Sequence, residues 1–221
     1  MTKLFSNGCS FLVPRPKDNV YSFSSEFLAK SYNLNLFNIA MGGRGNDRIS
    51  FTTKLWFYQN GFKDIFAVIG WTSSYRMDYV TNDEWKKGRI PNMDLTWRTW
   101  KISENLKFIN SCPGWDIEQT AVMRSLNHVL DLQNFFILHR IPYVMFNSLP
   151  AVWNRKIKDF ETMYEKIDKK RYFKPESSQL DFITENNFIV SKDDPHPSIE
   201  GHQEWAKLLK EFIDANNLRT I

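Results

Sequence analysis

The chain has 221 residues, of which 42% are hydrophobic, and it carries a formal net charge of +4 at neutral pH. This length suits one α/β domain with a sizeable core and is too short for two comfortable domains. The aromatic content, with 18 Phe, 8 Trp and 8 Tyr, excludes wholesale disorder. We therefore expect residues 1–221 to form a single globular domain.

The positive charge gathers in residues 155–174, where eight Lys and Arg accompany four Asp and Glu. A basic helix of this kind could meet nucleic acid or an anionic surface. The acids alternate with the bases, however, which is typical of a solvated helix stabilised by i,i+4 pairs. We favour the solvated helix, and nucleic-acid association stays open as an alternative.

The cysteines and the apolar runs indicate whether to expect a metal site, a disulfide framework or a membrane segment. Cys9 and Cys112 are the only cysteines, and neither belongs to a C-x-x-C or Cys/His cluster, so neither a metal site nor a disulfide framework is expected. The amino terminus shows no signal-peptide pattern, and no apolar run reaches the length of about eighteen residues that a membrane helix needs. We expect a cytoplasmic protein that does not associate with membranes.

Short β-like runs alternate with helical patterns along the chain. The strand candidates are residues 3–6, 36–40, 64–70, 143–147 and 188–190. Helical patterns cover residues 24–32, 47–60 and 116–139, and a last helix follows Pro197 and Ser198. This alternation predicts a parallel sheet covered on both faces, so the expected fold class is a three-layer α/β/α sandwich with a five-stranded parallel sheet.

Two segments, residues 75–114 and 151–185, interrupt this rhythm, and we interpret them as insertions of the kind that often form lids or binding loops. The first insertion and its end are rich in tryptophan: Trp85, Trp97, Trp100 and Trp115. These side chains could stack against sugar rings, or they could form a small core of the insertion itself. The sequence leaves both alternatives open.

The residues before the last helix carry a second kind of signal, Asp193-Asp194-Pro195-His196. An acid placed a few residues before a histidine in a proline-containing turn can bring a carboxylate beside an imidazole nitrogen and so prepare a general base. The spacing favours Asp193 as this acid, and Asp194 is its rival. His202, one helical turn further on, is expected to pack behind the site.

Three strand candidates run into segments that contain glycine and that would meet at one edge of a parallel sheet. The first runs into Gly8-Cys9-Ser10, the second into Met41-Gly42-Gly43 and the third into Gly70-Trp71-Thr72. Sites of α/β folds lie at this carboxyl edge, so Ser10 is a candidate nucleophile, although a serine in a turn is also common. A phosphate-binding loop at residues 42–45 is the weaker alternative because the glycine spacing fits no nucleotide motif.

Together these blocks resemble the SGNH (GDSL-like) hydrolases, and they occur in the family's order from Phe5 to Phe212. Gly8-Cys9-Ser10 is similar to the family's Gly-Asp-Ser, and Asn38-Ile39-Ala40-Met41-Gly42-Gly43 to its second block. Asp193-x-x-His196-Pro197 is similar to the block that supplies the acid and the base. The third block, Gly70-Trp71-Thr72, departs from the usual Gly-x-Asn.

The resemblance implies a flavodoxin-like sheet and acyl transfer through a serine. His196 would take the proton of Ser10 and Asp193 would orient the imidazole, while the backbone amides of Ser10 and Gly43, with Thr72, would hold the oxyanion. This chemistry requires no metal or organic cofactor. Loss of one oxyanion donor costs about 2.7–4 kcal/mol, so Thr72 in place of Asn predicts a weaker enzyme of the same class.

The predicted activity is hydrolysis of a small-molecule or glycan ester, and the tryptophans suggest deacetylation of a glycan. Arg76 and Trp71 are candidate substrate-binding residues, and Arg76 could also supply a compensating positive charge. An acyltransferase would use the same catalytic residues, and the departures at Cys9 and Thr72 leave a non-catalytic binding module on the same fold as another alternative. The Cys9-Ser10-Phe11 run also resembles SGNH-like proteins common in tailed-phage genomes, which would place the protein in the host cytoplasm.

Overall fold

A five-stranded parallel sheet forms the centre of the molecule. The computed structural model describes residues 1–81, 95–101 and 114–219. The strand order is β2-β1-β3-β6-β7, and the strands are β1 (Lys3–Asn7), β2 (Asn35–Asn38), β3 (Ile65–Trp71), β6 (Tyr143–Asn147) and β7 (Tyr172–Phe173). All four pairings in this sheet are parallel, which confirms the predicted α/β class and sheet type.

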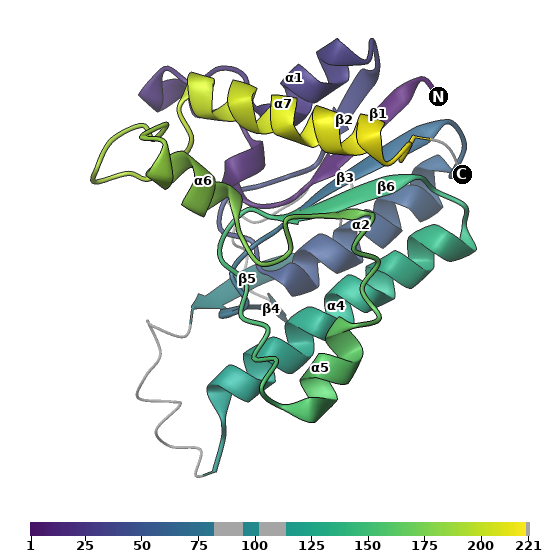
Figure 1. The fold of residues 1–221 in the computed structure, drawn as a ribbon, viewed down its shortest axis with the longest axis vertical. Coiled ribbons are helices and arrows are strands. Elements are labelled where there is room, and N and C mark those ends of the chain that lie inside the picture. The colour runs from purple at the N-terminus through teal and green to yellow at the C-terminus, as the bar shows by residue number, and fades with distance from the viewer. Residues whose placement is uncertain (82–94, 102–113, 220–221) are drawn as a thin grey trace.

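Helices cover both faces of the sheet (Figure 1). One face carries α1 (Ser24–Ser31) and α7 (Ile199–Ala215), and the other carries α2 (Asn46–Asn60) and α4 (Ile117–Leu138). Two shorter helices, α5 (Lys158–Tyr164) and α6 (Gln179–Glu185), follow β6 and β7 in the chain. Within the described ranges, no helix is both long enough and apolar enough to cross a membrane.

The apolar strands explain why both faces are covered. Successive side chains of a strand point to opposite faces, so a strand buried on both sides is apolar throughout. In β3, Phe66 and Val68 pack in the cluster that contains α1 and α7, whereas Ala67 and Ile69 pack in the cluster that contains α2 and α4. The near-continuous apolar run is therefore what made this strand predictable.

The fifth strand is not where the sequence pattern placed it. Residues 188–190 form only an isolated antiparallel bridge between Ile189 and Pro197. The edge strand is instead β7, whose two buried residues pair with Met145 and Phe146 of β6. Because β7 lies within residues 151–185, that segment completes the sheet and is not an insertion into it. Two residues are too few to show a strand period.

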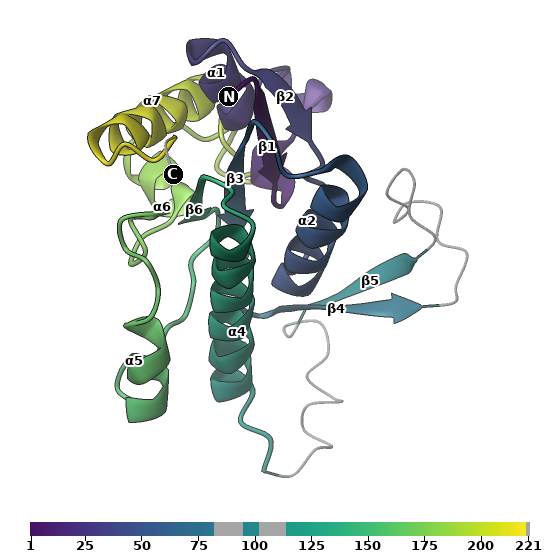
Figure 2. The same ribbon diagram turned by 90° about the vertical axis from the view of Figure 1, so that its right-hand side faces the viewer.

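Residues 75–114 add an antiparallel hairpin that projects away from the sheet (Figure 2). Its strands are β4 (Arg76–Thr81) and β5 (Thr96–Lys101). Trp97 is buried and lies 5.5 Å from the Phe51 ring, whereas Trp100 stacks on Trp115 with ring centroids 6.0 Å apart. Trp85 and Cys112 lie outside the described residues.

Arg155 of the basic segment forms ion pairs with Glu161 of the same segment and with Glu176 just beyond it. Arg155 Nε lies 2.7 Å from Glu161 and its Nη1 lies 3.1 Å from Glu176, and all three side chains are substantially exposed. Such exposed pairs are typical of a solvated surface and contribute little to stability. This arrangement fits the solvated helix that the alternating charges indicate.

His202 connects α7 to the start of α1. Its ring is fully buried, and Nδ1 accepts a hydrogen bond from the Ser24 backbone N–H at 3.2 Å and lies 2.9 Å from Ser24 Oγ. Burial, with a smaller contribution from the nearby His196, lowers the pKa of His202 to about 3. The ring is therefore neutral in the folded protein, and it packs behind the candidate site as expected.

We predict that His202 makes folding sensitive to acid. Its pKa is lower in the folded state than in the unfolded chain, so its contribution is present above the ordinary value of 6.5 and is lost as the pH falls towards 3. The free energy of unfolding should fall by up to about 1.4 kcal/mol per pH unit on this account. Urea unfolding between about pH 7 and pH 4 measures the slope.

His202→Asn keeps an acceptor for Ser24 and should flatten this pH dependence. His139→Asn is the matched control, because His139 is only half-buried, against Phe62, and should leave the slope as in the unmodified protein. Equal slopes for the unmodified protein and His202→Asn would show that His202 does not couple folding to pH.

Candidate active site

The topology brings three loops together at the carboxyl edge of the sheet. β1 pairs with β2 on one side and with β3 on the other, so the chain leaves β1 at the point where the strand order reverses direction. Ligands of open α/β sheets bind in the crevice at this point. Ser10 follows β1, Gly43 follows β2 and Thr72 follows β3, so the topology brings all three predicted loops to this edge.

Two glycines allow the loops after β1 and β3 to approach closely. A Cβ on Gly8 would lie 2.8 Å from the Gly70 carbonyl oxygen, and a Cβ on Gly70 would lie 2.5 Å from Ser148 Oγ and 2.8 Å from Leu12 Cδ1. Real Cβ atoms essentially never come this close to other atoms. Side-chain-free positions are therefore needed here for the segment that carries Ser10 to pack against the end of β3.

Ser10 and His196 meet although 186 positions separate them. Ser10 begins the short 3-10 helix η1 (Ser10–Leu12), and its Oγ lies 2.9 Å from His196 Nε2. The His196 loop is fixed by backbone hydrogen bonds, from Val190 N–H to the His196 carbonyl at 2.8 Å and from Ser198 N–H to the Phe188 carbonyl at 2.8 Å. The predicted nucleophile and base are thus in direct contact.

The acid that contacts His196 is Asp194, which corrects the prediction of Asp193. Asp194 Oδ1 accepts a hydrogen bond from His196 Nδ1, whereas Asp193 is exposed. Asp194 precedes Pro195, a position that favours extended backbone, and in extended backbone side chains two residues apart point to the same side. This placement of Asp194 and His196 fits the contact between their side chains.

The charges around His196 favour a neutral imidazole beside an ionised carboxylate. Burial lowers the pKa of His196, Asp194 raises it and Arg15 lowers it again, and the net effect is a pKa below the ordinary value. For Asp194, burial raises the pKa, but the hydrogen bond with His196 and the charge of Arg15 together lower it by more, so its pKa is below the ordinary range. Nδ1–H can therefore donate to Asp194 while Nε2 accepts from Ser10.

Arg15 is a member of this cluster that the sequence analysis missed. Its Nη2 pairs with Asp194 Oδ2, and its Nε lies 2.7 Å from Asp18. The only sequence signal was its position between Pro14 and Pro16, shortly after Ser10. Nothing in that pattern indicated a contact with a residue 179 positions away.

The loop after β2 lies beside Ser10. A Cβ on Gly42 would lie 3.7 Å from Ser10 Cβ, and Gly43 has a φ of +78°, a left-handed conformation that favours glycine. Among the residues that the structure describes, the backbone amides of Ser10 and Gly43 have no hydrogen-bond acceptor. Both amides can therefore donate to a ligand.

Thr72 and Arg76 form a polar pair next to this loop. The Thr72 backbone N–H donates to Asn46 Oδ1 at 2.9 Å, and Arg76 Nη1 donates to Thr72 Oγ1 at 3.0 Å. Trp71, by contrast, is 1% exposed and packs in the core cluster with α2 and α4. Its proposed contact with substrate is therefore wrong, and the neighbouring apolar positions of β3 explain why: Trp71 continues the buried strand.

The hairpin that carries Arg76 is fastened to the start of α2. Asp78 Oδ2 accepts from the backbone N–H groups of Gly45 at 2.7 Å and Arg48 at 3.1 Å, and the Asp78 backbone N–H donates to Asp47 Oδ2 at 3.0 Å. A carboxylate at a helix N-terminus satisfies otherwise unpaired donors. This junction fixes where Arg76 stands relative to the loop after β2.

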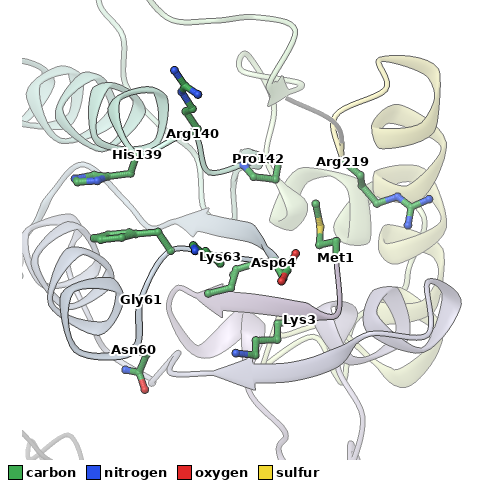
Figure 3. Close-up of a pocket in the computed structure, with 12 residues that line it drawn as sticks. Met1, Lys3, Asn60, Gly61, Lys63, Asp64, His139, Arg140, Pro142 and Arg219 are labelled. Atoms are coloured by element: carbon green, nitrogen blue, oxygen red, sulfur yellow. The ribbon is translucent and has the colours of Figure 1, made fainter.

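In residues 1–81, 95–101 and 114–219, no group of three or more His, Cys, Asp or Glu is placed to hold a metal ion. A pocket of about 870 Å³ opens at the opposite, amino-terminal edge of the sheet (Figure 3), where its lining includes Lys3, Asp64, Arg140 and Arg219. None of the predicted catalytic residues lines that pocket.

Solved structures with the same architecture are esterases. The psychrotrophic esterase EstA from Pseudoalteromonas sp., in a form inhibited by monoethylphosphonate, matches over 97% of this chain and 98% of its own, with a TM-score of 0.54 and 10% sequence identity. The chain has the SGNH hydrolase fold. The acetylxylan esterase Axe2 from Geobacillus stearothermophilus, in a catalytic mutant form, matches over 96% of this chain and 94% of its own, with a TM-score of 0.51 and 11% identity.

The sequence itself shows no comparable match. No protein-family model and no curated protein matches it. The resemblance to the SGNH hydrolases is therefore supported by the structural matches and not by a sequence match. The structural matches give no support to the resemblance to phage proteins.

We predict that Gly8 and Gly42, which both lie near Ser10, respond differently to alanine. Gly8→Ala should lower the free energy of unfolding by about 1–3 kcal/mol, because its Cβ would meet the Gly70 backbone, which cannot move aside. Gly42→Ala, whose Cβ makes an ordinary 3.7 Å contact, should stay within about 0.5 kcal/mol of the unmodified protein. Denaturant unfolding measures both, and equal values would contradict the close approach of β1 and β3.

Proposed function

We propose that this protein is a serine esterase in which Ser10 is the nucleophile, His196 the general base and Asp194 the acid that orients the imidazole. The observation that carries the proposal is the chain of contacts from Ser10 Oγ to His196 Nε2, at 2.9 Å, and from His196 Nδ1 to Asp194. Nucleophile, base and orienting acid in this order are the requirement for serine-based acyl transfer. The esterase neighbours support the same class of reaction.

In the proposed reaction, Ser10 Oγ attacks the ester carbonyl carbon as His196 Nε2 takes the hydroxyl proton. The tetrahedral intermediate then collapses, the C–O bond to the alcohol breaks, and His196 returns its proton to the departing alkoxide. A water molecule attacks the acyl-enzyme with His196 again acting as the base. The carboxylic acid leaves and Ser10 regains its proton, so the enzyme returns to its starting state.

The developing oxyanion would be held by the backbone amides of Ser10 and Gly43. Both donors lack an acceptor in the described part of the chain, and Gly42 packs against Ser10. Thr72 is only 1% exposed and its Oγ1 accepts from Arg76, so we assign the oxyanion to the two backbone amides alone. Preorganised donors of this kind supply a large part of the rate enhancement in acyl transfer.

A glycan ester is the substrate class that we favour. Trp100 stacks on Trp115, and it pairs across the hairpin with Met77, the residue after Arg76. The same hairpin carries Arg76, which contacts Thr72 at the end of β3, and flat aromatic side chains suit the apolar faces of sugar rings. The similarity to an acetylxylan esterase points in the same direction.

We predict that activity requires a neutral His196. Because burial holds the pKa of His196 below 6.5, kcat/KM should rise with pH through a midpoint below 6.5 and reach a plateau near neutral pH. Initial rates of ester hydrolysis between about pH 4 and pH 8 measure this profile, and a far-UV circular dichroism spectrum that stays constant over the same range excludes acid unfolding as its cause. A midpoint above 6.5 would contradict the neutral base.

Replacing the three proposed catalytic residues tests the function directly. With p-nitrophenyl acetate and an acetylated xylo-oligosaccharide as substrates, Ser10→Ala should abolish turnover. Asp194→Asn should lower kcat by roughly 10³- to 10⁴-fold, because the imidazole loses its orienting carboxylate. Asp193→Asn is the matched control, and it should keep kcat within about twofold because Asp193 is exposed.

Two outcomes would contradict this assignment. A folded protein with no more activity than Ser10→Ala on either ester would favour a binding module on the same fold. A larger loss for Asp193→Asn than for Asp194→Asn would return the orienting role to Asp193.

A further inference from the structure

Arg15 ties the turn after η1 to the loop that carries the proposed acid. Its Nη2 pairs with Asp194 Oδ2, while Asp194 Oδ1 contacts His196 Nδ1. On its other side, Arg15 Nε lies 2.7 Å from Asp18 Oδ2. The contacts therefore form one continuous chain, Asp18–Arg15–Asp194–His196–Ser10, and each carboxylate oxygen of Asp194 has its own partner.

The backbone around Arg15 is held in place by contacts that do not involve Asp194. Arg15 lies between Pro14 and Pro16, and proline restricts both its own φ and the conformation of the residue before it. Arg15 and Val20 exchange backbone hydrogen bonds of 2.6 and 3.1 Å, and the Asp18 N–H donates to the Arg15 carbonyl at 2.9 Å. The guanidinium is thus presented from a closed turn, and only 10% of the Arg15 side chain is exposed.

Asp194 has fewer restraints of its own. It lies in the loop between α6 and α7, next to exposed Asp193 and Pro195, and its side chain is 29% exposed. Its backbone N–H is held by Ser191, at 3.2 Å from the carbonyl and 3.1 Å from Oγ, but these contacts leave the carboxylate free to rotate. The pair with Arg15 fixes the second oxygen and so sets the plane of the carboxylate towards His196.

We propose that Arg15 is a positioning residue of this site: it holds the Asp194 carboxylate in the orientation that contacts His196. This inference rests on the function proposed above, and it adds a residue that neither the fold nor the resemblance to the SGNH hydrolases assigns. Arg15 acts through Asp194 and through its charge.

The groups that face His196 come from three elements besides its own loop. The turn at residues 15–20 contributes Arg15 and Asp18, η1 contributes Ser10 and the Phe11 ring at 5.1 Å, and α7 contributes neutral His202. Burial opposes the imidazolium, Asp194 and Asp18 favour it, and Arg15 opposes it. Ser191 still holds the Asp194 backbone when Arg15 is replaced, so the Asp194 charge stays beside the ring, and loss of the Arg15 charge therefore raises the pKa of His196.

Arg15→Gln and Arg15→Lys separate charge from packing. In Arg15→Gln, kcat should fall by roughly 10- to 100-fold with KM within about twofold, because the Asp194 carboxylate can then turn out of the plane that orients the imidazole, which affects the reacting geometry and not ester binding. The acid limb of its kcat/KM profile should move to higher pH. Arg15→Lys keeps the charge, so its acid limb should stay in place and kcat should be partly restored.

A direct titration of His196 by nuclear magnetic resonance needs no substrate. The His196 pKa should be higher in Arg15→Gln than in the unmodified protein and unchanged in Lys17→Gln, a control on the exposed residue of the same turn. In an Asp194→Asn background, Arg15→Gln should cause no further loss of kcat, because the pair it breaks is already absent.

The outcomes distinguish this inference from the proposed esterase function. An unmodified protein that hydrolyses esters through Ser10, with Arg15→Gln unchanged in kcat and in His196 pKa, would overturn the role of Arg15 alone. The same holds if Arg15→Gln and Arg15→Lys both lower kcat with an unmoved acid limb and titration. A protein without esterase activity whose His196 pKa still rises in Arg15→Gln would overturn the esterase and leave the Arg15–Asp194–His196 coupling in place.

Discussion

The parallel pairing of β1 with both β2 and β3 is the constraint on which the rest of the structure depends. It buries β1 on both faces, so Leu4 belongs to the cluster with α1 and α7 and Phe5 to the cluster with α2 and α4. It also brings the ends of three strands to one edge, and the close approach of Gly8 to Gly70 packs those ends together. Ser10 stands at this junction because it follows β1, which pairs with β2 on one side and with β3 on the other.

The second half of the site depends on the docking of α7. A Cβ on Gly201 would lie 2.5 Å from the Phe188 carbonyl oxygen, so the first turn of α7 closes tightly on the loop before it. Ser198 caps the helix by accepting from the Gly201 N–H at 3.1 Å, and Trp205 anchors the helix against Phe146 and Phe173. His196 is thus held between a helix cap and a backbone bridge, and burial of α7 contributes directly to the geometry of the base.

The fold could be predicted wherever burial leaves a pattern in the sequence. β3 and β6 are continuous apolar runs, and α7 has apolar residues at helical spacing, so their positions were confirmed within a residue or two. β7 escaped prediction because its pairing with β6 depends on tertiary packing of only two residues. The prediction that Trp71 binds substrate was wrong for a related reason. Its position after a glycine at the end of a strand indicated the site, but Trp71 is the last residue of β3 and its side chain is buried.

The site residues show a similar division. Ser10 and His196 could be found because their blocks follow a strand and precede a helix, and topology then brings them together. The choice between Asp193 and Asp194 depends on the direction in which two adjacent side chains point, and the spacing of the motif does not encode this direction. In the structure, Asp194, which directly precedes Pro195, is the residue that contacts His196. Arg15 could not be found at all, since its ion pair joins distant segments and is visible only in three dimensions.

Peptide mapping by mass spectrometry after treatment with an alkylphosphonate probe tests the Ser10–His196–Asp194 site most directly. An activated serine displaces the leaving group of the probe and keeps a covalent phosphonyl group, whereas ordinary surface serines do not react at neutral pH. We expect a single adduct on the peptide that contains Ser10, formed far more slowly in His196→Ala. An adduct on another residue, or a folded protein that forms none, would contradict a serine hydrolase site at Ser10.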